Sequence, residues 1–293
     1  MKSPHLLAAI DLGSNSFHLQ VARVEGDQLY YLDAHKESVR LAGGLTSSGM
    51  LDAASQRRAL DCLARMGERL RGMPLESVRA VGTNTLRVAR NAEDFLVRAR
   101  ATLGFDIEVV AGREEARLIY LGVSHSLAHD TAPRLVVDIG GGSTECIIGR
   151  GYTPSEREST RIGCVVYSNR FFPRGTVTKV AMKEARLAAE VALGPVAAQF
   201  RRGQWRRSFG VASGRWRLAL LVRLGLWARS CYRTVSPMAR LRVPGSSGCA
   251  PAWLRRATLV DWIFQASSRI VNRLLRVGWL SWLAFSMRLI LRP

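Results

Sequence analysis

The feature that most constrains the fold of this chain is a glycine-rich turn set between two apolar runs. Val136 and Val137 belong to an apolar run that breaks at Asp138, and three consecutive glycines follow at positions 140–142. A second apolar run begins at Cys146. Apolar, β-branched runs that are bounded by glycine are typical of buried strands, so this stretch predicts two strands joined by a tight turn.

The composition of the turn favours an anion as its ligand. Glycines can adopt positive φ and carry no side chain that would obstruct a ligand, so several backbone N–H groups can converge on one anion. Phosphate is the expected ligand. The alternative interpretation is a hairpin turn that binds no ligand. Asp138 and Glu145 lie on either side of the turn. Carboxylates at these positions suit a Mg²⁺ ion that is bound together with phosphate oxygens.

A second copy of this design lies near the start of the chain. Residues 6–10 form an apolar run, the polar turn at residues 11–16 follows, and residues 17–22 form another apolar run. Two such units in one chain predict two half-sites that face each other across a cleft, each binding a phosphate or the shared metal ion.

Four segments of the chain resemble motifs of a known family. They are DLGSNSFH at residues 11–18, GTNTLR at 82–87, GREEARLIY at 112–120 and DIGGGSTE at 138–145. In their order, spacing and residue identities these segments resemble the exopolyphosphatase and guanosine pentaphosphate phosphatase family. That family belongs to the actin, sugar-kinase and Hsp70 superfamily. The likeness runs from about residue 6 to about residue 210 and then stops.

The resemblance implies an α/β fold with two ribonuclease H-like (actin-like ATPase) domains, a cleft between them, and an incomplete second domain. Residues 1–130 would form the first domain, 131–210 the start of the second, and 211–293 an aberrant basic tail rich in Trp, Arg and Leu. The apolar periodicity predicts the elements of this fold. Strands are expected at 6–10, 18–24, 29–39, 78–81, 107–110 and 155–161, and helices at 52–71, 92–102, 163–172 and 183–200, with another that begins at Gly112.

Glu115 and Arg87 would carry out the chemistry that the resemblance implies. Glu114 and Glu115 fall in the first turn of a predicted helix, where acidic residues also favour the positive end of the helix dipole. By motif position, Glu115 is the catalytic base that would take a proton from the attacking water. Arg87 matches the arginine of the family that contacts phosphate oxygens, and a solvated helix arginine is the alternative.

The remaining site residues are predicted to bind phosphate or metal. Asp11 would join the metal ligands, although it could equally cap its own turn. The phosphate-binding residues are Gly13, Ser14, Asn15, Ser16, Gly140, Gly141, Gly142, Ser143 and Thr144, and the metal ligands are Asp138, Glu145 and Asp11.

Composition separates the tail from the rest of the chain. Residues 209–293 hold 14 Arg and one Asp, with no Lys or Glu, and so carry +13 of the net charge of +20. The rest is only mildly basic, so nucleic acid is not expected as a partner. Because Lys and Glu ordinarily solvate helix surfaces, their absence predicts an out-of-frame translation that begins near Val211. The alternative is a genuine Arg- and Trp-rich segment that lies on a membrane surface.

The five cysteines are widely separated, which favours reduced thiols and a cytoplasmic protein. A genuine tail would add peripheral association with the inner face of the membrane. The resemblance also implies that members pair as homodimers. The basic segment at residues 201–207 is interpreted as a solvated helix end or, alternatively, as a track for long polyphosphate.

Together these features predict an exopolyphosphatase that uses Mg²⁺ and water activated by Glu115 to release terminal phosphate from inorganic polyphosphate. Guanosine pentaphosphate is the alternative substrate, because the same site would serve both. A different function is that of an ATP-binding kinase or a chaperone-like member of the superfamily. The motif at residues 112–120 argues against this function, because it matches the phosphatases. A catalytically inactive remnant of the family is the non-enzyme alternative.

Overall fold

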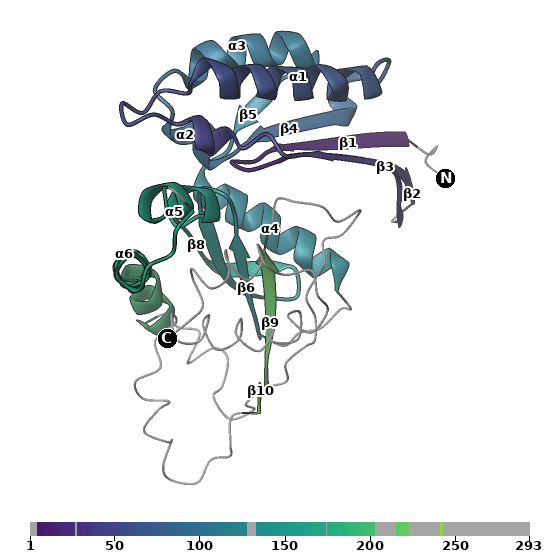
Figure 1. Cartoon of the computed structure of the whole chain (residues 1–293). Helices are drawn as coiled ribbons and strands as arrows, with labels where there is room; N and C mark the ends of the chain where they lie inside the picture. The colour runs from purple at the N-terminus through teal and green to yellow at the C-terminus, as the bar shows by residue number, and fades with distance from the viewer. Residues whose placement is uncertain are drawn as a thin grey trace, which may run out of the picture. The chain divides into compact units, whose positions relative to one another are not determined.

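The computed structural model describes residues 5–26, 28–127, 133–173, 175–202, 215–222 and 241–242 (Figure 1). Its contacts divide the chain into two compact units. The first holds the described residues of Met1–Glu115 together with Gly140–Gly142. The second holds most of the remainder, beginning at Ala116. The helix that starts at Gly112 therefore belongs mainly to the second unit, whereas the sequence analysis assigns residues up to 130 to the first.

The first unit is built on a five-stranded mixed sheet of order β3-β2-β1-β4-β5. Three consecutive strands form an antiparallel meander, and β4 and β5 extend it as parallel neighbours of β1. This arrangement matches the ribonuclease H-like meander expected from the sequence. The strands are β1 (His5–Leu12), β2 (Phe17–Glu25), β3 (Gln28–Glu37), β4 (Val78–Gly82) and β5 (Ile107–Val109).

Helices α1 (Ala53–Arg69) and α3 (Ala92–Leu103) cover one face of this sheet (Figure 1). Alternate residues of β1, such as Ile10 and Leu12, pack against the buried side of α1, where Leu63 and Met66 have no exposed surface. The N-terminus of α1 is capped by Asp52, whose side chain accepts a hydrogen bond of 2.6 Å from the backbone N–H of Ser55.

The second unit repeats this strand order in the sheet β10-β9-β6-β7-β8. Its first three strands again form an antiparallel meander, and β9 lies parallel to β6. The fold class expected from the sequence is therefore confirmed. The strands are β6 (Pro133–Ile139), β7 (Thr144–Arg150), β8 (Thr153–Thr160), β9 (Arg215–Val222) and β10 (Leu241–Arg242).

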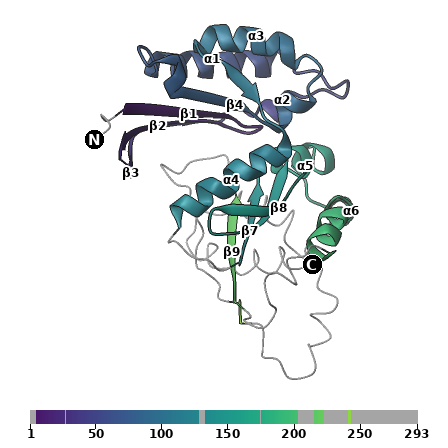
Figure 2. The same cartoon turned by 180° about the vertical axis from the view of Figure 1, so that it is seen from behind.

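Helices lie on both faces of the second sheet (Figure 2). On β6 the side chains alternate: Val137 packs with α5 (Cys164–Phe171) and α6 (Lys179–Arg202), whereas Val136 packs with α4 (Gly112–Ser126). Burial on both faces explains why this strand has an unbroken apolar run in the sequence.

Two features of the fold differ from the sequence prediction. A short helix, α2 (Asn84–Val88), was not expected, because five residues are too few to show a helical period. The strand β9 lies within the segment that the sequence analysis assigns to an aberrant tail, yet it extends the second sheet. In the described part of the chain, only the two-residue β10 follows β9, so the second domain is incomplete there. No described helix is long and apolar enough to cross a bilayer.

Candidate functional site

The first polar turn is a four-residue loop that closes the β1–β2 hairpin. Leu12 and Phe17 are the last paired residues, and the loop residues Ser14, Asn15 and Ser16 are all buried. The hydroxyl of Thr85 donates a hydrogen bond of 2.7 Å to the hydroxyl of Ser14. This bond ties the loop to the motif that begins at the end of β4, so two of the segments recognised in the sequence meet at one place.

A neighbouring loop supports the same turn from outside. The backbone N–H of Arg40 donates to the carbonyl of Asn15 at 2.6 Å, and that of Ala42 donates to the carbonyl of Ser14 at 2.9 Å. Arg40 has φ 52 and ψ 47, and among the described residues it is the one non-glycine with positive φ. Such a conformation costs free energy outside glycine and persists where surrounding bonds impose it. The turn is therefore held in a defined shape.

Two glycines of the second turn, Gly141 and Gly142, are required by close approach to other chain segments. A Cβ on Gly141 would lie 2.9 Å from the backbone nitrogen of Asn15, and one on Gly142 would lie 2.3 Å from Nδ2 of Asn84. None of the three glycines of this turn has positive φ. The positive φ that the glycine-rich sequence suggested for these residues is therefore absent. The absence of a side chain is what the fold uses, and by their contacts Gly140–Gly142 belong to the first unit.

Arg87 and Glu115 form a shielded ion pair within the first unit. Nη1 of Arg87 lies 2.9 Å from Oε2 of Glu115, and the two side chains are 19% and 9% exposed. The same nitrogen donates to the carbonyl of Val110 at 2.8 Å. Arg87 is thus anchored to the loop before α4, and its fork of donors is positioned at the first turn of that helix. A solvated helix arginine, the alternative weighed for Arg87, does not fit this geometry.

The two glutamates at the start of α4 have different surroundings. Glu115 is buried, whereas Glu114 is only partly buried. A helix dipole acts on both, so it does not account for the burial of one carboxylate against an arginine.

Asp138 and Glu145 are direct cross-strand neighbours in the β6–β7 ladder and are each only 1% exposed. Opposite residues of a ladder place their side chains on the same face, where two negative charges repel each other. The hydroxyl of Ser159 donates to Oε1 of Glu145 at 2.8 Å. Glu145 also acts on the next residue: the pKa of the Cys146 thiol is raised to about 12, first by burial and then by the charges of Glu145 and Glu158.

This pair of carboxylates fits a hard divalent cation. Mg²⁺ prefers oxygen ligands and is held in proteins by one or two carboxylates together with phosphate oxygens and water. A cation at this position would offset the repulsion between the two carboxylates. Asp138 and Glu145 are therefore the residues of the second unit that could hold the metal ion expected from the sequence.

Asp11 occupies the matching position in the first turn, where its ladder partner is His18. Nε2 of His18 lies 3.0 Å from the hydroxyl oxygen of Ser16, so the imidazole contacts a residue of the predicted phosphate loop. His18 is not among the site residues predicted from the sequence. The strand alternation that places it opposite Asp11 was visible, but its contact with Ser16 was not.

Thr144 and Ser143 follow the glycines and are both buried. The Thr144 hydroxyl donates to the carbonyl of Ile162 at 2.6 Å, so its proton serves the fold of the second unit. The Thr144 hydroxyl therefore has no proton left to donate to a phosphate in this arrangement. The basic segment begins with Arg201 and Arg202 at the end of α6, and the rest of it, 203–207, lies outside the described residues.

Sequence reasoning missed the contribution of the threonine in the second motif. Thr85 bonds to Ser14 of the first turn, and Asn84 lies beside Gly142 of the second. The signal that could have found them is the run of polar residues directly after a predicted strand, a usual position for groups that bind a ligand.

Comparison with known proteins gives a consistent result. A model of the Ppx/GppA phosphatase family matches residues 20–218, which is more than half of the chain. The match begins after the first polar turn and extends past residue 210, where the resemblance noted in the sequence stops.

Three solved structures are similar to this chain. An exopolyphosphatase from Cytophaga hutchinsonii is 28% identical with a TM-score of 0.64, over 69% of this chain and 64% of that chain. The PPX-GPPA enzyme of Aquifex aeolicus is 32% identical with a TM-score of 0.54, over 66% and 64%. An exopolyphosphatase-like protein is 29% identical with a TM-score of 0.63, over 66% and 62%. The matched part of the chain thus spans slightly less than two thirds of each of these proteins.

Proposed function

Since the chain belongs to the Ppx/GppA phosphatase family, we propose that it hydrolyses the terminal phosphate of inorganic polyphosphate, with Glu115 as the general base. The attacking water gives a proton to the Glu115 carboxylate as its oxygen bonds to the terminal phosphorus. The bond from phosphorus to the bridging oxygen breaks, and the shortened chain leaves. The products are orthophosphate and a polyphosphate that is one unit shorter.

The ion pair between Arg87 and Glu115 is the observation that carries this proposal. A general base must be ionised and must keep one oxygen directed at the water that it activates. Arg87 holds Oε2 of Glu115 at 2.9 Å and so fixes the orientation of the carboxylate. The guanidinium has further N–H donors for phosphoryl oxygens, so one arginine can position both the base and the group under attack.

The other groups supply positioning and charge neutralisation, which are the main requirements of phosphoryl transfer. Backbone N–H groups and hydroxyls of the two turns would bind phosphate oxygens. Asp138 and Glu145 would hold Mg²⁺, which when bound neutralises charge on the phosphate chain.

The choice of substrate rests on the similar structures. One of them is an exopolyphosphatase and another is described as exopolyphosphatase-like, with 28% and 29% sequence identity to this chain. Guanosine pentaphosphate has the same phosphoric anhydride bond, and it is the competing substrate in the experiment below.

The tail bears on whether this chain is active. We infer that the reading frame changes after the segment that the family model matches. The described strand β9 ends at Val222 and the match at residue 218, so the change would fall later than Val211, the position expected from composition. Resequencing the gene from codon 205 onward tests this, and an unbroken frame with the same bases overturns it.

The experiment is phosphate release from long-chain polyphosphate and from guanosine pentaphosphate, with Mg²⁺ and with EDTA. Glu115→Gln is expected to lower turnover about 100- to 10,000-fold, the usual contribution of a general base. Glu114→Gln is the matched control, because it removes an equal charge from the same helical turn. Equal losses in both variants would overturn the role of Glu115. Faster turnover of guanosine pentaphosphate would overturn the choice of substrate.

A further inference from the structure

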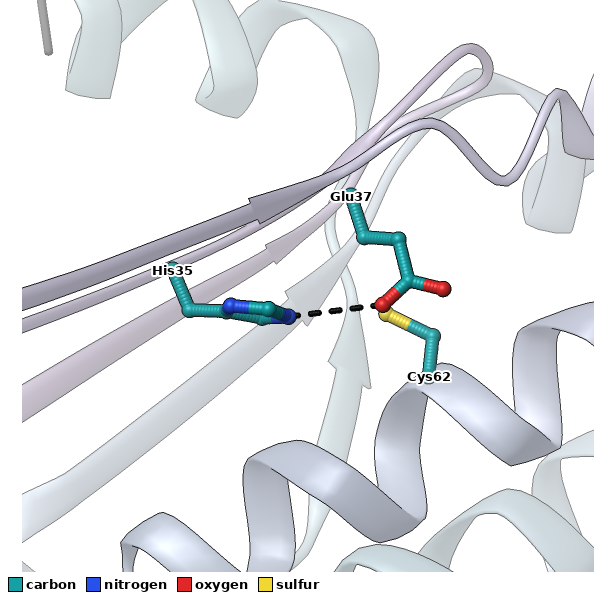
Figure 3. Close-up of side chains that lie close together, drawn as sticks. All are labelled: His35, Glu37 and Cys62. Atoms are coloured by element: carbon teal, nitrogen blue, oxygen red, sulfur yellow. Dashed lines mark hydrogen bonds and ion pairs between the residues drawn. The ribbon is translucent and has the colours of Figure 1, made fainter. Parts of the chain in front are cut away.

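Three side chains with metal-binding atoms gather between β3 and α1 (Figure 3). His35 and Glu37 are two residues apart on β3 and so lie on the same face of the strand. Cys62 projects toward them from α1. Nε2 of His35 lies 3.4 Å from Oε2 of Glu37, and the three ligand atoms all lie within 4.8 Å of one another.

We propose that His35, Glu37 and Cys62 form a binding site for a borderline divalent cation of the Zn²⁺ type. One nitrogen, one oxygen and one sulfur ligand make a set that Zn²⁺ accepts and that Mg²⁺ and Ca²⁺ do not favour. In a tetrahedral Zn²⁺ site the ligand atoms are about 3.3–3.8 Å apart, from metal–ligand bonds of about 2.0–2.3 Å. The observed separation of 3.4 Å between His35 and Glu37 falls in this range.

Arg65 positions the carboxylate of this site. Its Nε donates to Oε2 of Glu37 at 3.1 Å, and its Nη2 pairs with Oε1 of the same carboxylate. Burial by itself would raise the pKa of Glu37, but hydrogen bonds from Arg65 and His35 outweigh it and hold that pKa below its ordinary value. Ligating carboxylates in proteins are commonly oriented by such outer partners. A cation bound at Oε2 would take the place of the contact that this oxygen makes with Nε2 of His35.

The site is open on one side and closed on the other. Cys62 has no exposed surface, whereas the side chains of His35 and Glu37 are 22% and 30% exposed. A cation could therefore enter from the side of β3 and keep a water molecule as its fourth ligand. The pKa of the Cys62 thiol is raised to about 12, first by burial and then by the charge of Glu37. Binding consequently replaces the thiol proton with the cation and releases that proton to solvent, with no change of oxidation state.

A bound cation would join β3, an edge strand of the first sheet, to α1. Asp33 already pairs with Arg69 of α1 at 2.8 Å, one turn along the same interface. The site uses none of the residues proposed for phosphate hydrolysis. The cation-binding proposal can therefore be tested independently of that function. Its role would be structural.

The test uses Co²⁺ as a spectroscopic substitute for Zn²⁺ on the full chain after EDTA treatment. Coordination by Cys62 is expected to produce a thiolate-to-Co²⁺ charge-transfer band, which carboxylate sites cannot produce. Titration with Zn²⁺ should abolish the band at one equivalent and should raise the midpoint of thermal unfolding. Cys62→Ser and His35→Gln should each lose the band, and Arg65→Gln should weaken Zn²⁺ binding about 10- to 100-fold.

Matched variants separate this site from other thiols and imidazoles of the chain. Cys164→Ser, His125→Gln and the double variant Cys231→Ser/Cys249→Ser should keep the band at full strength. His35→Gln leaves the buried thiol in place, so it tests the site even where Cys62→Ser impairs folding. A band that survives His35→Gln, a band lost in the double variant, or no band in a folded wild-type chain would each overturn the proposal.

Discussion

The two hairpins β1–β2 and β6–β7 have the same construction but differ at one decisive position. In each, an Asp lies one residue before the end of the first strand, and a four-residue loop follows. The residue opposite this Asp is His18 in the first hairpin and Glu145 in the second. One hairpin therefore pairs a carboxylate with an imidazole, and the other pairs it with a second carboxylate. The second hairpin therefore places two carboxylates on one face, whereas the first places only one there.

The loops differ in a complementary way. The first presents the side chains of Ser14, Asn15 and Ser16, and the second is three glycines followed by Ser143. The glycines leave space that Asn15 and Asn84 occupy. The first loop can carry a side chain at Asn15 because the second has none at Gly141, so the two loops cannot be exchanged.

The sheets that carry these hairpins also differ in how they are completed. In the first unit, β4 and β5 are both parallel additions, and α3 links them. In the second, β9 is a parallel addition but β10 pairs antiparallel with it over two residues. The second sheet therefore depends on a strand from the basic tail, whereas the first is complete before residue 110.

Among the changes that test this comparison of the hairpins, the largest effect is expected at the position where they differ. Glu145→Gln removes a proposed Mg²⁺ ligand and should lower phosphate release on the order of 100-fold, because metal coordination stabilises the transition state by several kcal/mol. It should also raise the Mg²⁺ concentration needed for half-maximal rate. His18→Gln should lower the rate only a few-fold, since one hydrogen bond contributes about 1 kcal/mol. The measurement is a Mg²⁺ titration of the rate of both variants. Equal shifts of the two curves would refute the different roles of Glu145 and His18.

The next effect concerns the space between the loops. Gly141→Ala places a Cβ 2.9 Å from a backbone nitrogen and should lower the free energy of unfolding by about 1–3 kcal/mol. Gly122→Ala on α4 is the control, because beyond its chain neighbours and the adjacent helix backbone no atom lies within 4 Å of a Cβ built there. It should leave stability unchanged or raise it by up to about 1 kcal/mol. Urea unfolding measures both, and a stable Gly141→Ala chain would contradict the close approach.

A smaller effect is expected from the threonine that holds each turn. Thr85→Val removes the donor to Ser14, and Thr144→Val removes the donor to Ile162. Each should cost about 1–2 kcal/mol, because a buried acceptor loses its partner. Thr85→Val should also raise the KM for polyphosphate, and Thr85→Ser should restore it. Unchanged KM in Thr85→Val would mean that this bond serves only the fold.

The smallest effect compares helix caps. Asp52 caps α1, whereas α5 begins after Gly163 with no capping side chain. A hydrogen bond from the backbone of Ser55 lowers the pKa of Asp52 below its ordinary 3.8. The stabilisation is therefore present above that ordinary pKa and is lost as pH falls through the lower folded-state value.

Asp52→Ala should accordingly cost about 0.5–1 kcal/mol near neutral pH, toward the lower end for so exposed a cap. Gly163→Asp should stabilise α5 by a few tenths of a kcal/mol. Thermal unfolding between pH 2 and pH 7 checks both variants. A cost of Asp52→Ala that stays constant across this range would show that the cap does not act through its charge.

Much of the fold could be predicted from the sequence because its signals are local. Alternating or unbroken apolar runs identified the strands of both meanders and most of the helices. The Asp–turn–strand pattern identified both hairpins, and the register that places Glu145 opposite Asp138 follows from a four-residue loop. Short α2 escaped because it has no period, and β9 escaped because its composition resembles the rest of the tail.

The sequence by itself determined the strand order of each meander, the two turns and the motifs of the Ppx/GppA phosphatase family. Only the tertiary structure decided which side chains meet. Thr85 reaches Ser14, Arg87 binds Glu115, and Cys62 approaches His35 across a helix and a strand. The physical reason is range: periodicity reports on neighbours within a few residues, whereas these contacts join residues far apart in the chain. They depend on how strands order within a sheet and how helices pack on its face.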